Sequence, residues 1–204
     1  MKRDSFIRLV LALLVLASAL APVQPTSANE TTSVAVSAPE PEPQASNIGV
    51  NGFFSVDRAQ QGSSFQAAVV MDIPGGLHVN ANKPLGKYSV PTVVKVDAPR
   101  GFRVTPVSYP RGSVRTFSFG GAEATRIAVY EGRAIFRFNV SVPPEQPFGV
   151  ENVRVSVRFQ SCTDEVCYPP ATRNLDLHIG VVGRDVPSNR INGQYFGGGG
   201  RRKR

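Results

Sequence analysis

The sequence predicts an all-β domain, an immunoglobulin-like antiparallel β-sandwich, and three observations support this prediction. Apolar and polar residues alternate with a period of two in short segments, most clearly in 134–142, 153–160 and 175–179. Proline and glycine turns separate the segments, and no stretch after residue 28 shows a sustained helical period. Short strands with one apolar face are typical of an antiparallel sandwich, while a jelly roll or a small barrel is the alternative.

The strands are expected in a definite order along the chain. In 134–142, Phe136, Phe138, Val140 and Val142 share one face, while polar residues alternate on the other. The segment 153–160 repeats this alternation with valines, and 175–179 repeats it again. Shorter apolar runs bounded by turns give the remaining expected strands: 65–71, 77–80, 91–97, 102–107 and 127–130.

The amino-acid composition divides the chain into four regions. Residues 1–28 have a basic start and an apolar stretch of about 13 residues, typical of a signal peptide and too short to span a bilayer. Residues 29–48 are rich in Pro, Ser and Thr and are expected to be a disordered leader. We expect the β-sandwich over 49–184 and a flexible, glycine-rich basic tail over 185–204. The mature protein should then be soluble, exported and not membrane-spanning.

Net charge argues against a nucleic-acid partner. The formal charge of +8 falls to +6 without residues 1–28, and the last four residues carry +4 of the remainder. The folded part is therefore close to neutral. Its basic residues are not grouped with aromatic residues on one element, as a nucleic-acid surface would require.

The chain contains two cysteines, Cys162 and Cys167, which lie between the strand 153–160 and a strand expected to begin near Thr172. Such a pair can form a structural disulfide, hold a metal or exchange electrons. A disulfide closing so short a loop would stabilise the fold by only about 2 kcal/mol, so a purely structural role is weakly motivated. The two histidines, His78 and His178, lie far away in sequence, and we expect no metal and no cofactor.

Several motifs resemble one known family. The segment Cys162–Pro170 has two nearby cysteines followed by an aromatic residue and Pro-Pro. Upstream lie Gly76–Leu85, with the run Asn-Ala-Asn-Lys-Pro, and then Tyr-Ser-Val-Pro-Thr at 88–92. Tyr109-Pro110 and Val129–Gly132 add to the match, which covers roughly residues 50–180. Together these motifs resemble the N-terminal periplasmic domain of the thiol:disulfide interchange protein DsbD.

The resemblance implies an immunoglobulin-like fold, a periplasmic location and a reversible Cys162–Cys167 disulfide that passes electrons to thioredoxin-fold periplasmic proteins. In the family a membrane domain reduces this domain, and a thioredoxin-like domain completes the relay. The chain shows no Cys-x-x-Cys and no transmembrane segment. We therefore expect a stand-alone, monomeric oxidoreductase domain whose disulfide is reduced again by a separate membrane reductase.

The resemblance also implies roles for the two cysteines. By analogy Cys167 attacks and Cys162 resolves, although the sequence does not fix the order. The neighbouring Asp164 and Glu165 are expected to raise a thiol pKa, because a nearby carboxylate disfavours the thiolate. Tyr168 and the two prolines after it would stiffen the loop or simply end a strand.

Other side chains are candidates for lining or capping the pair. His78 and Asn80 alternate, so they share a face, and in the family the corresponding positions flank the cysteines. The alternative is two solvent-facing residues on an edge strand. Family members also cap the disulfide with an aromatic residue on a loop, and here Phe117 or Phe119 fits, unless either is simply part of the core.

Two other functions stay open at this point. The chain could be a non-catalytic immunoglobulin-like binding module whose disulfide only stiffens a loop. It could also be a copper(I) chaperone that uses the two thiolates.

Overall fold

The structure, a computed structural model, describes residues 47–86, 88–118 and 123–197, which all lie in one compact unit. Almost every element is a strand, because alternating β-branched and aromatic residues favour a pleated, half-buried surface. The elements are β1 (Gly49–Phe54), β2 (Arg58–Gln60), β3 (Ser64–Asp72), β4 (His78–Asn80), β5 (Val93–Asp97), β6 (Arg103–Val104), β7 (Ser113–Phe117), β8 (Thr125–Tyr130), β9 (Arg133–Ser141), β10 (Gly149–Phe159), β11 (Ser161–Cys162), β12 (Ala171–Val182) and the short 3₁₀ helix η3 (Gly193–Tyr195).

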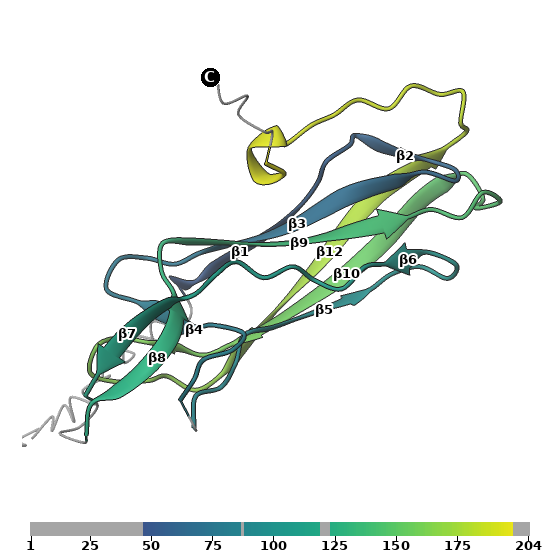
Figure 1. The fold of residues 1–204 in the computed structure, drawn as a ribbon. Coiled ribbons are helices and arrows are strands. Elements are labelled where there is room, and N and C mark those ends of the chain that lie inside the picture. The colour runs from purple at the N-terminus through teal and green to yellow at the C-terminus, as the bar shows by residue number, and fades with distance from the viewer. Residues whose placement is uncertain (1–46, 87, 119–122, 198–204) are drawn as a thin grey trace, which may run out of the picture. The chain divides into compact units, whose positions relative to one another are not determined.

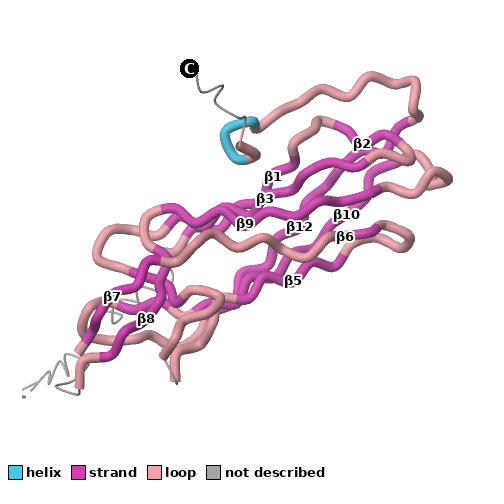
Figure 2. The backbone as a smooth tube through the Cα atoms, in the orientation of Figure 1, coloured by secondary structure: helices cyan, strands magenta, loops and turns pink. Residues whose placement is uncertain are grey.

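The strands form three sheets, in the orders β1-β3-β9-β6, β2-β12-β10-β5 and β11-β4-β8-β7. Neighbouring strands are antiparallel, except that β2 runs parallel to β12. Figure 1 shows the first two sheets as two layers, with β4, β7 and β8 of the third at one end. Figure 2 shows that loops connect the strands at both ends of these layers. The predicted immunoglobulin-like β-sandwich is confirmed.

The core lies between the layers and follows the predicted alternation. Phe136, Phe138, Val140 and Val142 are all at most 3% exposed. The facing residues of β10 are the valines at 153, 155 and 157 and Phe159, also buried. Burying one such side chain contributes about 1.5–3 kcal/mol, so these two strands anchor the fold. Because β10 is long and well packed, it places the residues that follow it at a fixed end of the sandwich.

The expected strands are present, with some differences in their bounds. The segment 102–107 forms only the two-residue β6, because Pro106 has no N–H to continue a ladder. Strands β1, β2, β7 and β11 were not predicted. Two glycines interrupt the alternation in β1, and the first four residues of β7 are exposed.

Residues 184–197, here called the C-terminal strap, run back along β1 and β2. The sequence predicts a flexible tail from residue 185, but the structure holds these residues with specific contacts. Asn189 donates hydrogen bonds to the Asp57 carboxylate from its backbone N (2.9 Å) and its Nδ2 (2.8 Å), which lower the pKa of Asp57. The Tyr195 ring stacks on Phe53 at 4.2 Å.

The expected signal peptide and nearly all of the expected leader lie outside the described residues, as does the tail from residue 198. No helix in the described part of the chain has the length and apolar character needed to cross a membrane.

Candidate thiol–disulfide site

Cys162 and Cys167 form a disulfide in a tight loop that directly follows β10 and β11. The Thr163 N–H donates to the Val166 carbonyl at 2.8 Å. The Thr163 hydroxyl accepts from the N–H groups of Glu165 (3.2 Å) and Val166 (3.1 Å). These bonds fold the loop on itself, and the two cysteine Cα atoms lie 4.0 Å apart. The loop therefore has its own local hydrogen bonds besides the disulfide.

The two cysteines differ in exposure. Cys162 is 0% exposed, because β11 pairs with β4 beneath it. Cys167 is exposed, as are Asp164, Glu165 and Val166 in the loop. A protein partner could therefore reach Cys167, whereas Cys162 is shielded. The expected effect of the loop carboxylates on a thiol pKa stays a prediction.

His78 and Asn80 both lie on β4, and each is only 2% exposed. The alternative of two solvent-facing residues on an edge strand is wrong, because β4 lies between β11 and β8. His78 is paired directly with Cys162 across the β4–β11 ladder. The structure thus places His78 beside the disulfide and Asn80 two residues further along the same face.

Phe117 ends β7, and its ring stacks on the His78 imidazole with centroids 4.2 Å apart and planes 18° apart. It is 6% exposed and forms a small buried cluster with Ile127 and Val129, separate from the main core. Phe117 therefore covers His78 instead of filling the space between the layers. Phe119 lies outside the described residues.

The electrostatics of His78 are set mainly by burial. Burial lowers its pKa because it disfavours the charged imidazolium. Asp164 and Glu131 oppose this by raising the pKa, while Arg115 lowers it further. The net effect is a lowered pKa, which favours the neutral imidazole.

Gln160, which the sequence pattern does not predict as a site residue, connects the parts of the site. Its Oε1 accepts from Asn80 Nδ2 at 3.1 Å and from the Val90 N–H at 3.3 Å. Its Nε2 donates to the Tyr168 carbonyl at 3.1 Å. One side chain thus links β4, the loop before β5 and the far side of the cysteine loop. A polar residue at the end of an alternating strand looks like a surface position, so the sequence carried no signal for this role.

Tyr168 follows Cys167 and is partly buried against the main core. Its N–H donates to the Ser161 carbonyl at 3.0 Å. This bond joins the residue after Cys167 to the residue before Cys162. The two prolines after it are exposed. The stiffening role of Tyr168 stays a prediction.

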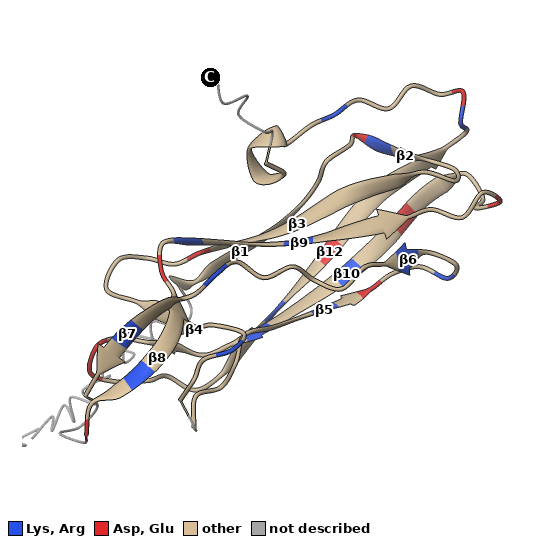
Figure 3. Ribbon diagram, in the orientation of Figure 1, with Lys and Arg blue, Asp and Glu red and all other residues tan. Residues whose placement is uncertain are grey.

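Within the described ranges, no group of three or more His, Cys, Asp or Glu side chains could hold a metal ion. Both cysteines are bonded to each other, so neither is a free thiol in this state. Figure 3 shows basic and acidic residues interspersed over the strands. Arg154 of β10 and Asp97 of β5 form one ion pair, with 2.6 Å between Arg154 Nη2 and Asp97 Oδ2.

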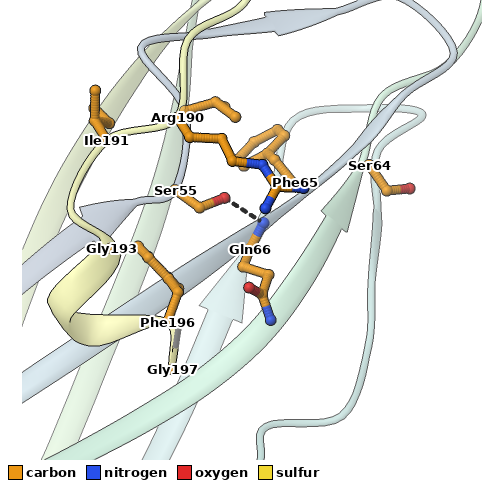
Figure 4. Close-up of a pocket in the computed structure, with 10 residues that line it drawn as sticks. Ser55, Ser64, Phe65, Gln66, Arg190, Ile191, Gly193, Phe196 and Gly197 are labelled. Carbon is orange, nitrogen blue, oxygen red and sulfur yellow. Dashed lines mark hydrogen bonds between the residues drawn. The ribbon is translucent and has the colours of Figure 1, made fainter. Parts of the chain in front are cut away.

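A pocket of about 370 Å³ lies away from the disulfide and shares no residue with it. Figure 4 shows its wall, where the C-terminal strap residues Arg190 and Phe196 face Phe65 and Gln66 of β3. Its dashed hydrogen bond joins the Gln66 N–H to the Ser55 hydroxyl at 2.9 Å. The residues that line this pocket include no cysteine, histidine or carboxylate.

Solved structures provide one comparison, and no curated protein matches the chain. The chain is similar to the N-terminal periplasmic domain of ScsB from Proteus mirabilis (14% identity, 64% of this chain, 47% of that chain, TM-score 0.40). It is also similar to a family 123 glycoside hydrolase from Clostridium perfringens (11%, 67%, 27%, TM-score 0.38). A third is the complex between the DsbD N-terminal and PilB N-terminal domains from Neisseria meningitidis (18%, 60%, 80%, TM-score 0.36).

Likenesses of this size carry no argument about function, and the chain spans about half the length of the ScsB domain. The sequence itself is more informative. The family model described as "Thiol:disulfide interchange protein DsbD, N-terminal" matches residues 50–179, which is more than half of the chain. This match includes both cysteines, β4 and β7, and it confirms the resemblance found in the sequence motifs. The chain belongs to the DsbD N-terminal domain family.

Proposed function

We propose that this protein is a thiol:disulfide interchange domain that passes electrons to partner proteins through a reversible Cys162–Cys167 disulfide. The observation that carries the proposal is the unequal exposure of the pair, with Cys162 buried and Cys167 exposed. Exchange needs one accessible sulfur that meets the partner and a second that resolves the mixed disulfide. Membership of the family supports the same chemistry.

The reaction follows from these positions. In the reduced domain, the Cys167 thiolate attacks a disulfide of a client protein, and one client sulfur leaves as a thiolate. Cys162 then attacks the Cys167 sulfur, which releases the second client thiolate and restores the Cys162–Cys167 bond. The client gains two electrons and the domain loses them. A dithiol on a reductant returns the electrons by the same steps in reverse.

The surroundings of the pair suit this cycle. The self-folded loop keeps Cys162 and Cys167 close together, so the second sulfur meets the first without a large rearrangement. Gln160 and Tyr168 hold both ends of the loop on β4 and β11. His78 and Asn80 line the buried side, and Phe117 caps His78.

The partners and location belong to the same proposal. We expect the domain to act in the periplasm on thioredoxin-fold proteins. A separate membrane reductase would then reduce its disulfide again. Membership of the DsbD N-terminal domain family supports protein partners for this domain. The domain would then be an oxidoreductase whose substrates are proteins.

Single-cysteine variants test this proposal. Cys162→Ser leaves the exposed Cys167 thiol without a resolving partner, so it should trap a mixed disulfide with an oxidised periplasmic protein. Cys167→Ser leaves only the buried Cys162 and is the matched control, expected to trap little. If neither variant trapped a protein, the interchange proposal would be refuted. The binding-module alternative instead requires a Cys162→Ser/Cys167→Ser double variant that retains all partner binding.

A further inference from the structure

Three buried polar atoms next to the disulfide have no hydrogen-bond partner. They are His78 Nε2, Asn80 Oδ1 and Ser161 Oγ. Across residues 47–86, 88–118 and 123–197, no other buried side-chain nitrogen or oxygen lacks a partner. All three lie on the short β4–β11 strand pair that carries Cys162. A buried polar group without a hydrogen-bond partner lowers the stability of the fold. Because all three such atoms lie beside the disulfide, we looked to the chemistry of the disulfide for the partner that they lack.

His78 is the best placed of the three to act on a sulfur. Residues paired directly across antiparallel strands point to the same side of the sheet, with Cβ atoms about 4.5–5.5 Å apart. His78 and Cys162 are such a pair, and they are 2% and 0% exposed. Phe117 stacks on the imidazole from β7, which keeps water from this side.

The difference between the oxidised and reduced forms of Cys162 explains why His78 Nε2 has no hydrogen-bond partner in the disulfide form. A sulfur in a disulfide has no proton, so Cys162 cannot donate a hydrogen bond to His78 in the oxidised protein. Reduction places a thiol proton on the Cys162 sulfur. A neutral imidazole has one nitrogen that accepts a hydrogen bond or a proton. The partner that His78 lacks in the disulfide form is therefore available in the reduced form.

Building on the proposed interchange function, we propose that His78 is the base that removes the Cys162 thiol proton during the resolving step. In that step the Cys162 sulfur bonds to the Cys167 sulfur, and the bond between Cys167 and the client sulfur breaks. The electron pair of the broken bond leaves on the client thiolate. The Cys162 proton moves to His78 Nε2, which later releases it to the client thiolate or to water.

The charged groups around His78 are consistent with this role. The charges of Asp164 in the cysteine loop, Glu131 directly after β8 and Arg115 on β7 act on the imidazole. The two carboxylates would stabilise the imidazolium that forms transiently, while burial keeps the resting imidazole neutral. A base must be neutral before it accepts a proton, and the lowered pKa of His78 favours this form.

The two steps can be measured separately with the chromogenic disulfide dithiobis-nitrobenzoate and the reduced mature protein in a stopped-flow instrument. Attack by Cys167 releases one nitrothiobenzoate, and resolution by Cys162 releases the second. His78→Gln keeps a hydrogen-bonding side chain but has no basic nitrogen. His178→Gln is the matched control, because His178 is exposed on β12 and is the other histidine of the chain.

At pH 7 we expect the second phase of His78→Gln to be slowed about 10²-fold, with the first phase unchanged, as for loss of a general base. The difference should shrink at alkaline pH, where the thiol ionises without a base. His178→Gln should match the wild type. An unchanged second phase, or slowing that is equal at every pH, would overturn the role of His78. A wild-type protein that released no second equivalent would instead refute the interchange function itself.

A measurement on the unaltered protein covers the case in which His78→Gln does not fold. Nitrogen-15 NMR distinguishes the two imidazoles, and reduction should shift His78 Nε2 toward a hydrogen-bonded acceptor. His178 should keep its shift and serves as the internal reference. An identical His78 spectrum in both redox states would contradict the inference.

Discussion

Gln160→Ala offers a quantitative test of how the site is held together. The substitution removes the side chain that accepts from Asn80 Nδ2 and the Val90 N–H and donates to the Tyr168 carbonyl. It leaves three polar groups without their partner in a partly buried region. The backbone of β10 and the core valines before it are untouched, so the effect should be local.

The magnitude follows from counting these bonds. A typical intramolecular hydrogen bond contributes about 0.5–1.5 kcal/mol net, and leaving a buried partner unsatisfied costs more. Water can reach part of this region and replace some of the loss. We therefore expect the free energy of unfolding to fall by about 2–3 kcal/mol. With a urea slope of about 2 kcal/mol per molar, the unfolding midpoint should drop by roughly 1 M.

Urea unfolding of the oxidised protein, followed by circular dichroism, measures this change. The control is Gln66→Ala, because the Gln66 side chain is exposed on β3 and should alter stability by less than about 0.5 kcal/mol. If both variants unfolded at the same urea concentration, the reasoning that Gln160 ties the cysteine loop to β4 would be refuted.

Three further predictions concern the cap, the C-terminal strap and the disulfide. Phe117→Ala should uncover the buried side of the disulfide and speed its reduction by glutathione several-fold. The control is Val114→Ala, because Val114 is 47% exposed on the same strand and its loss should leave the rate unchanged. Equal reduction rates for the two variants would argue against a capping role for Phe117. The folded pKa of Asp57 lies below its ordinary value of 3.8, so its contribution to stability is present above that pH and is lost as the pH falls through the folded pKa. Hydrogen exchange in the C-terminal strap should therefore accelerate in acid before exchange in β10 does, and simultaneous acceleration would contradict this. The Cys162→Ser/Cys167→Ser double variant should remain folded and lose only about 2 kcal/mol, since the closed loop is short; an unfolded variant would show that the fold depends on the disulfide.

Much of the fold was predictable because it depends on local alternation. The inward face of β9, from Phe136 to Val142, and the valines of β10 are buried as their spacing indicates. The place of the cysteine pair, after β10 and before β12, follows from the same pattern. Strand β7 was not predicted, because its first four residues are exposed and only Phe117 at its end is buried.

The remaining features depend on contacts between distant segments. Gln160 acquires its role only when β4, the segment at Val90 and Tyr168 converge on it. The C-terminal strap has few apolar residues, so its composition suggested a flexible tail. Its contacts are made with distant residues such as Phe53 and Asp57, which lie more than a hundred residues earlier in the chain.

The reduction potential of the Cys162–Cys167 pair tests the central claim most directly. The purified mature domain would be equilibrated against thiol redox buffers, and the fractions of oxidised and reduced protein measured by thiol alkylation. The proposed interchange function predicts a potential above about −250 mV, among exchanging disulfides. A potential below about −300 mV would mark a structural bond and contradict the account.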